Sequence, residues 1–119
     1  MRIYNVTRGA ELAGDAFAAR SVWKRTVGLL GRAGLDPGEA LLIEPCSSIH
    51  TAFMRFAIDV LYLNRAGQVV KAVGSMKPFR LSAKWVGAHS VIELPSGAIA
   101  ASGTEVGDQL TLDDQPTTA

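Results

Sequence analysis

The sequence predicts a mostly β domain of the α+β class, a compact antiparallel sheet that closes toward a small barrel, with one or two short helices. Most of its apolar stretches are short, as strands are, and Gly and Pro punctuate the chain between them. Only one segment clearly repeats its apolar residues with the period of a helix. Closure toward a barrel is the economical architecture because it removes exposed sheet edges.

The chain begins with two short strands, followed by the clearer of the two helices. Residues 2–6 alternate well enough for a first strand, and residues 17–20 are a second candidate after a loop rich in Gly and Ala. Behind Ser21, a suitable N-cap, the apolar residues of 22–30 recur at i, i+4 and i+7 along one helix face. Gly31 stands where a glycine ends a helix.

The middle of the chain is predicted to be β structure. Residues 40–44 read as a buried strand that Pro45 ends. Residues 49–56 and 58–64 then form two strands, or one long bent strand. An Asn-Arg-Ala-Gly loop of hairpin length follows, so residues 68–73 are expected to return as the next strand.

The last part of the chain contains the doubtful helix. An irregular stretch at 75–84 precedes a strand candidate at 85–94. A Pro-Ser-Gly turn opens a short helix at 98–101, and Gly103 closes it. Residues 109–112 form the final strand before a polar tail.

Length and composition indicate one domain, expected over residues 1–112, with residues 113–119 as a tail that frays. The formal net charge is +1, which gives no general attraction to nucleic acid or to an anionic membrane. A single cysteine, Cys46, cannot form an internal disulfide. No stretch approaches the roughly 18 apolar residues of a membrane helix, and the N-terminus lacks the apolar region of a signal peptide. We therefore expect a cytoplasmic protein that does not contact the membrane.

The stretch IHTAFMRFAIDVLYLN, residues 49–64, places His50, Arg55 and Asp59 in an otherwise apolar run. Strict alternation puts His50 and Arg55 on opposite faces of the strand, unless a bulge intervenes near residue 57. Because a buried unpaired charge is costly, the structural interpretation pairs Arg55 with Asp59 or with Glu93 and so fixes the strand register. In the functional interpretation Arg55 binds an anion through its guanidinium fork, and His50 donates a hydrogen bond or a proton.

Other chemistry finds little support in the residue spacing. Cys46 and His50 lie roughly 13 Å apart in an extended chain, too far for a nucleophile and its base. The two histidines and the one cysteine do not have the spacing of zinc ligands, and no G-x-S-x-G motif is present. No cofactor or metal is expected. The acid-free, basic stretch 60–92 contains few aromatic residues that could stack a base, so nucleic acid is not the partner that we expect.

Four blocks of sequence together resemble the small prokaryotic family called domain of unknown function 192. They are WKRTVGLLGRAGLDPGEALLIEP, IHTAFMRFAIDVLYLNRAGQVVKAV, MKPFR and GAHSVIELPSGAIAASGTEVGDQL. The resemblance covers residues 21–112, with Leu30, Ala57 and Ser96 departing from the usual Met, Pro and Ala. The positions that match the family blocks are Arg25, Gly28, Gly31, Arg32, His50, Thr51, Met54, Arg55, Asp59, Lys77, Pro78, Glu93, Pro95, Gly97 and Asp108.

The resemblance implies a compact, predominantly β domain with short helices, and no established biochemical role. Many relatives look exported or membrane-anchored, whereas the N-terminal residues here do not resemble such a leader, so we expect this chain in the cytoplasm. The polar residues shared with the family overlap those that the apolar run singles out.

Three hypotheses of function follow. The first is a non-enzymatic domain that binds a small ligand or a partner protein. Basic groups outnumber acidic ones at its site, so an anionic ligand is favoured. The second is a small enzyme with His50 as general acid or base and Arg55 stabilising an anion. The third is a structural or assembly role without a pocket. The candidate binding residues are His50, Thr51, Arg55, Lys77 and Arg80, with Asp59 and Glu93 as orienting carboxylates.

Overall fold

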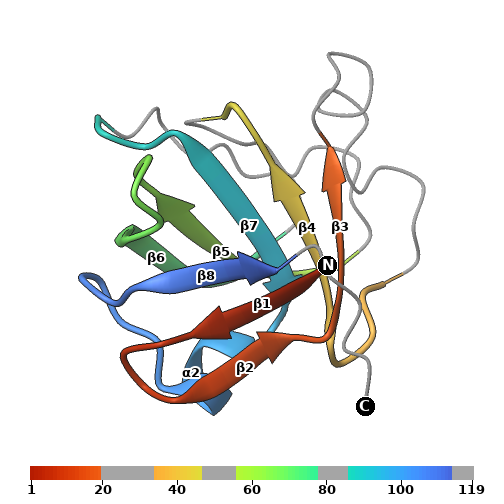
Figure 1. Cartoon of the computed structure of the whole chain (residues 1–119). Coiled ribbons are helices and arrows are strands. Elements are labelled where there is room, and N and C mark those ends of the chain that lie inside the picture. The colour runs from red at the N-terminus through yellow and green to blue at the C-terminus, as the bar shows by residue number, and fades with distance from the viewer. Residues whose placement is uncertain (20–33, 47–55, 78–85, 114–119) are drawn as a thin grey trace.

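A computed structural model of the chain describes residues 1–19, 34–46, 56–77 and 86–113. The described strands form two sheets (Figure 1). One has three strands in the order β2-β1-β8, and the other has five in the order β3-β4-β7-β5-β6. The elements are β1 (Arg2–Asn5), β2 (Ala10–Ala13), β3 (Asp15–Ala19), β4 (Glu39–Ile43), β5 (Ile58–Leu63), β6 (Val69–Met76), β7 (Ser90–Pro95), α2 (Ala98–Ser102) and β8 (Leu110–Asp113).

The predicted mostly β, α+β class is confirmed, but the described strands do not close into a barrel. The two sheets touch through an isolated bridge between Gln68 and Gln109. Pairing is antiparallel except between β3 and β4, which run parallel. Parallel neighbours need a long crossover, and the residues 20–38 between these two strands are long enough to supply it.

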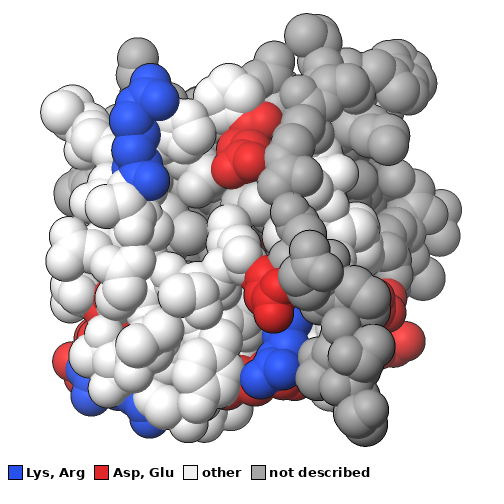
Figure 2. All heavy atoms as spheres, viewed as in Figure 1, with Lys and Arg blue, Asp and Glu red and all other residues white. Residues whose placement is uncertain are grey.

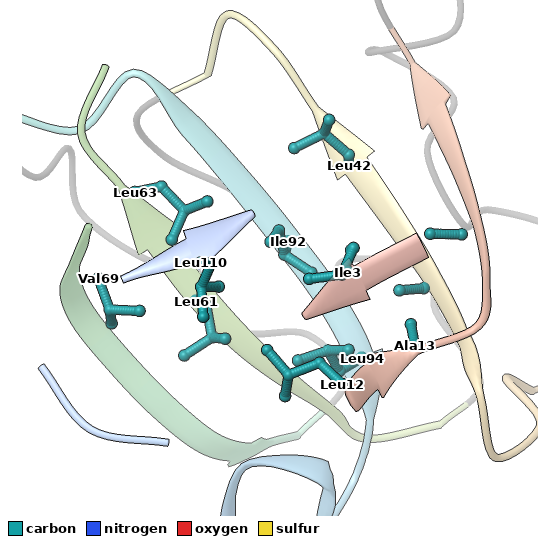
Figure 3. Packing of buried hydrophobic residues seen from close by; sticks show 12 residues of the cluster. Ile3, Leu12, Ala13, Leu42, Leu61, Leu63, Val69, Ile92, Leu94 and Leu110 are labelled. Carbon is teal, nitrogen blue, oxygen red and sulfur yellow. The ribbon is translucent and has the colours of Figure 1, made fainter. Parts of the chain in front are cut away.

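The three-stranded sheet packs across one face of the five-stranded sheet, which we call the inner face (Figure 3). Ile3 and Leu110 of the smaller sheet meet Leu61, Ile92 and Leu94 of the larger one in a single apolar cluster. A second cluster covers the opposite, outer face and includes Leu41, Ile58, Val60, Tyr62 and Val91. Burial on both faces explains why β4, β5 and β7 are apolar along nearly their whole length.

Most predicted strands appear within a residue or two of their expected bounds, but three differences are informative. β2 is a strand where the sequence predicted a loop. β6 continues to Met76 rather than ending at residue 73, and β7 begins only at Ser90. The predicted short helix is confirmed as α2, with Gly97 and Gly103 in the left-handed region at its two ends. The helix predicted at 22–30 and the strand at 49–56 lie outside the described residues, apart from Phe56.

A buried polar cluster joins the β1–β2 loop to the loop between α2 and β8. Asn5, which is fully buried, donates to Thr104 Oγ1 and to Asp108 Oδ2, both at 3.0 Å, and accepts from the Arg8 backbone N–H. Arg8 forms an ion pair with Asp108 at 2.9 Å and a second one with Glu105. The hydrogen bonds from Arg8 and then from Asn5 hold the pKa of Asp108 well below its usual range.

None of the described helices is long and apolar enough to span a membrane.

Replacing Asn5 by alanine is expected to lower the free energy of unfolding by about 2 kcal/mol, because the substitution leaves buried polar groups without their partner. Thermal or urea denaturation measures the loss. Thr111→Ala on the exposed surface of β8 is the matched control, and it should change the stability by less than about 0.5 kcal/mol. Equal stability of the two variants would show that the cluster contributes nothing to the fold.

Candidate functional site

The candidate site is centred on Glu93, in the middle of β7 and of the five-stranded sheet. Its direct cross-strand neighbours are Leu41 on β4 and Val60 on β5. Directly paired residues point to the same side of a sheet, so the Glu93 side chain lies on the outer face with that apolar cluster. The other β7 residues on this face, Val91 and Pro95, are apolar.

The Glu93 carboxyl group is buried, and one of its oxygens is unpaired among the described residues. The residue is 4% exposed, and its Oε2 atom has no hydrogen-bond partner among the described residues. Burial away from water raises the pKa of Glu93 to about 7, because it disfavours the charged form. Near neutral pH the group therefore spends much of its time protonated, and a protonated carboxyl group can donate a hydrogen bond.

Asp59, the other predicted orienting carboxylate, has different surroundings. Its Oδ1 accepts the Ser75 backbone N–H at 2.7 Å, and its Oδ2 accepts the N–H groups of Gly97 and Ile99 at 3.1 and 2.9 Å. Asp59 pairs with Leu94, which belongs to the inner cluster, so its side chain lies on the inner face. The structure therefore places Asp59 and Glu93 on opposite faces of the sheet, and it gives Asp59 three backbone partners.

Lys77 is the one candidate basic residue within the described part of the chain. It is exposed and follows directly after β6, whose last residue, Met76, packs in the outer cluster. The remaining predicted binding residues, His50, Thr51, Arg55 and Arg80, lie outside the described residues. Their approach to Glu93 stays a prediction from the sequence.

Charged side chains are spread thinly over the face drawn in Figure 2, with uncharged surface between them. Nucleic-acid-binding proteins instead gather Lys and Arg into a continuous patch or stripe. The described residues of this face give no support to a nucleic-acid partner. Among all the residues that the structure describes, no three His, Cys, Asp or Glu side chains come together as metal ligands do.

The polar groups that the sequence did not single out lie in loops or at the end of a strand. Asn5 and Arg8 form the cluster described above, and Arg65 and His89 flank a surface hollow. The sequence contains no signal for these two residues, because neither an isolated Arg in a hairpin loop nor a lone His before a strand belongs to a recognised motif. Only the folded arrangement of the loops brings Arg65 and His89 together.

Comparison with known proteins agrees with this fold. Residues 4–112 match the family described as DUF192, Uncharacterized ACR. A UPF0127 protein of Pyrococcus furiosus is 37% identical over 112 residues, which cover 89% of this chain and 93% of the relative. A UPF0127 protein of Thermococcus sibiricus is 30% identical over 115 residues, covering 91% and 72% of the two chains. The crystal structure of a protein of unknown function from Novosphingobium aromaticivorans superposes with a TM-score of 0.82 at 17% identity, covering 94% of this chain and 84% of that one, which supports the fold alone.

Proposed function

The chain belongs to the DUF192 family, which is described as uncharacterised, and we propose that it is a non-enzymatic domain that binds a small anionic ligand beside Glu93 on the outer face of the five-stranded sheet. The observation that carries this proposal is the buried Oε2 atom of Glu93, which has no hydrogen-bond partner among the described residues. Buried polar side-chain atoms are nearly always hydrogen-bonded, so an unpaired one needs an explanation. A bound ligand is one such explanation.

The protonation of Glu93 favours an anion as the ligand. A carboxyl group that keeps its proton offers one O–H donor, and hydrogen bonds from O–H to a charged oxygen are short and strong. The apolar neighbours Leu41 and Val60 strengthen such a bond because they exclude water. An ionised Glu93 would repel the same ligand.

Positive charge for the ligand would come from the basic residues predicted from the sequence. Lys77 is the described member of this set, exposed at the end of β6. The sequence prediction alone assigns Arg55, His50 and Arg80 to the site. In this proposal the Arg55 guanidinium holds the anion with two parallel hydrogen bonds, and the protonated Glu93 adds a third.

A thermal-shift screen of dicarboxylates, nucleotides and sugar phosphates on the full chain tests the proposal. A ligand present at 100 times its dissociation constant should stabilise the fold by about 2.7 kcal/mol, which raises the melting temperature by roughly 10 °C. Its affinity should increase as the pH falls through about 7, because the anion binds the protonated form of Glu93. For a dicarboxylate, which does not titrate in this range, Glu93→Gln should abolish this pH dependence, since the amide has no proton to lose.

Two further variants make the test specific. Glu105→Gln removes an exposed carboxylate from the loop between α2 and β8. It should leave both the affinity for the anion and its pH dependence unchanged. Arg55→Lys keeps the charge but not the planar fork, so it should weaken binding roughly tenfold. Anion binding that is the same in wild type and Glu93→Gln at every pH would contradict the proposed site. A screen in which none of the anions binds would contradict it as well.

A further inference from the structure

A hollow of about 520 Å³ lies between the β5–β6 loop and the segment that precedes β7. Both segments are at the same edge of the molecule, at the left of Figure 1. The volume is within the range of small-molecule sites. Its lining contains two basic side chains and no acidic one, and consists of Asn64, Arg65, Ala66, Gly87, Ala88 and His89.

The two basic side chains in this hollow donate no side-chain hydrogen bond to another described residue. Arg2 and Arg8 form ion pairs with acidic side chains, whereas exposed Arg65 forms no ion pair or hydrogen bond with another described residue. The half-buried His89 uses only its backbone, which donates to Leu63 O at 2.7 Å and accepts from Cys46 N at 2.8 Å. Its ring has no hydrogen-bond partner among the described residues. A guanidinium and an imidazole thus line one hollow, and within the described part of the chain no other residue takes up their donors.

Hydrogen bonds hold the Arg65 loop in a fixed conformation. Asn64 Oδ1 accepts the N–H groups of Ala66 and Gln68 at 3.0 and 2.9 Å. The Gln109 side chain donates to Ala66 O at 2.7 Å, which ties the loop to the start of β8. Gly67 has φ +84°, and a Cβ there would lie 2.9 Å from the Leu110 carbonyl oxygen, so the loop sits tightly on its neighbour. A site on such a loop is preorganised and loses little entropy when it binds.

We propose that this hollow binds the phosphate group of a small phosphorylated molecule, through the guanidinium of Arg65 and the ring of His89. The guanidinium presents its donors in a planar fork that fits phosphate oxygens, and the imidazole adds a donor from the facing segment. Asn64, Ala66 and the Gly87–Ala88 backbone leave room for the remainder of the molecule. His89 lies four residues before Glu93, roughly 13 Å along the strand, so the inference does not depend on the ligand proposed at Glu93.

An NMR titration of the full chain with glucose 6-phosphate, inorganic phosphate and glucose tests this site. Glucose 6-phosphate should shift the amide signals of residues 64–66 and 87–89 and bind more tightly than inorganic phosphate, and glucose should have no effect. Arg65→Ala should weaken the binding of glucose 6-phosphate roughly tenfold or more, and Arg65→Lys should retain part of the affinity. His89→Asn should also weaken the binding of glucose 6-phosphate.

Lys71→Ala on β6 is the control matched in charge, because it removes one positive charge outside the hollow. It should change the affinity for glucose 6-phosphate less than twofold. An equal loss in Lys71→Ala and Arg65→Ala would overturn the proposal, because binding would then follow net charge alone. Equal affinities for inorganic phosphate and glucose 6-phosphate would also overturn it. Far-ultraviolet circular dichroism confirms that each variant is folded.

Discussion

Replacing Glu93 with leucine is expected to stabilise the folded chain at pH 8 by about 3 kcal/mol. Burial raises the pKa of Glu93 from 4.5 to about 7, and each unit of difference from the unfolded chain corresponds to about 1.4 kcal/mol at a pH where both states are ionised. Leucine has a similar size and no charge, and the cross-strand neighbours Leu41 and Val60 are apolar. The melting temperature should rise by roughly 10 °C.

In the wild-type chain, the burial of Glu93 should make the free energy of unfolding depend on pH. Below about pH 4.5 Glu93 is protonated in both states, so its folded environment carries no ionisation penalty. Between pH 4.5 and 7 the unfolded chain releases the proton while the folded chain keeps it, so the free energy of unfolding falls as the pH rises. Above about pH 7 the loss is complete. Urea denaturation of wild type, Glu93→Leu and Glu93→Gln at several pH values measures this window.

The same series decides between two interpretations of the sequence. If Glu93 formed the ion pair with Arg55 that the structural interpretation suggests, its ionised form would be stabilised. The slope between pH 4.5 and 7 would then be absent, and stability would instead be lost as the pH falls below about 4.5. Glu93→Leu would then destabilise the fold, since it would leave a cation unpaired. A stabilising leucine variant instead shows that the fold tolerates an unpaired carboxyl group, as binding sites do.

The strands that could be predicted from sequence are those with strong local signals. β4, β5 and β7 are apolar on both faces along most of their length, and the loop Asn64–Gly67 has the composition of a hairpin turn. β2 was missed because its sequence, AELA, has little β propensity and adjoins glycines on both sides. It is a strand because Ala13 pairs with Ile3 of β1 and packs into the inner cluster. Contacts distant in sequence decided this element, as they decided the parallel pairing of β3 with β4.

The relation between the two carboxylates also depends on distant contacts. Alternation along one strand assigns residues to two sides, but it does not show which side of one strand matches which side of another. The register between β5 and β7 pairs Asp59 with Leu94 and Glu93 with Val60, which places the acids on opposite faces. A shift by one residue would have put them on the same face. One sequence therefore identifies both buried acids without revealing that they occupy separate environments.

Asp59→Ala is expected to be strongly destabilising, by about 4 kcal/mol, because it removes the acceptor from three backbone N–H groups at a buried position. Two of these groups, on Gly97 and Ile99, connect the start of α2 to β5. The third belongs to Ser75, whose φ of 49° lies in the left-handed region that side chains other than glycine's rarely adopt. Loss of the carboxylate thus releases a helix and a strained strand segment together.

Urea denaturation measures the global loss, and amide hydrogen exchange locates it. Protection should fall first at Ser75, Gly97 and Ile99, since their N–H groups lose their acceptor. Asp59→Asn keeps one acceptor oxygen and should lie between wild type and Asp59→Ala. Asp36→Ala removes an exposed carboxylate from a turn and should change stability by less than about 0.5 kcal/mol. If Asp59→Ala were as mild as Asp36→Ala, the carboxylate would not hold α2 against the sheet, and an orienting role at a binding site would become its better explanation.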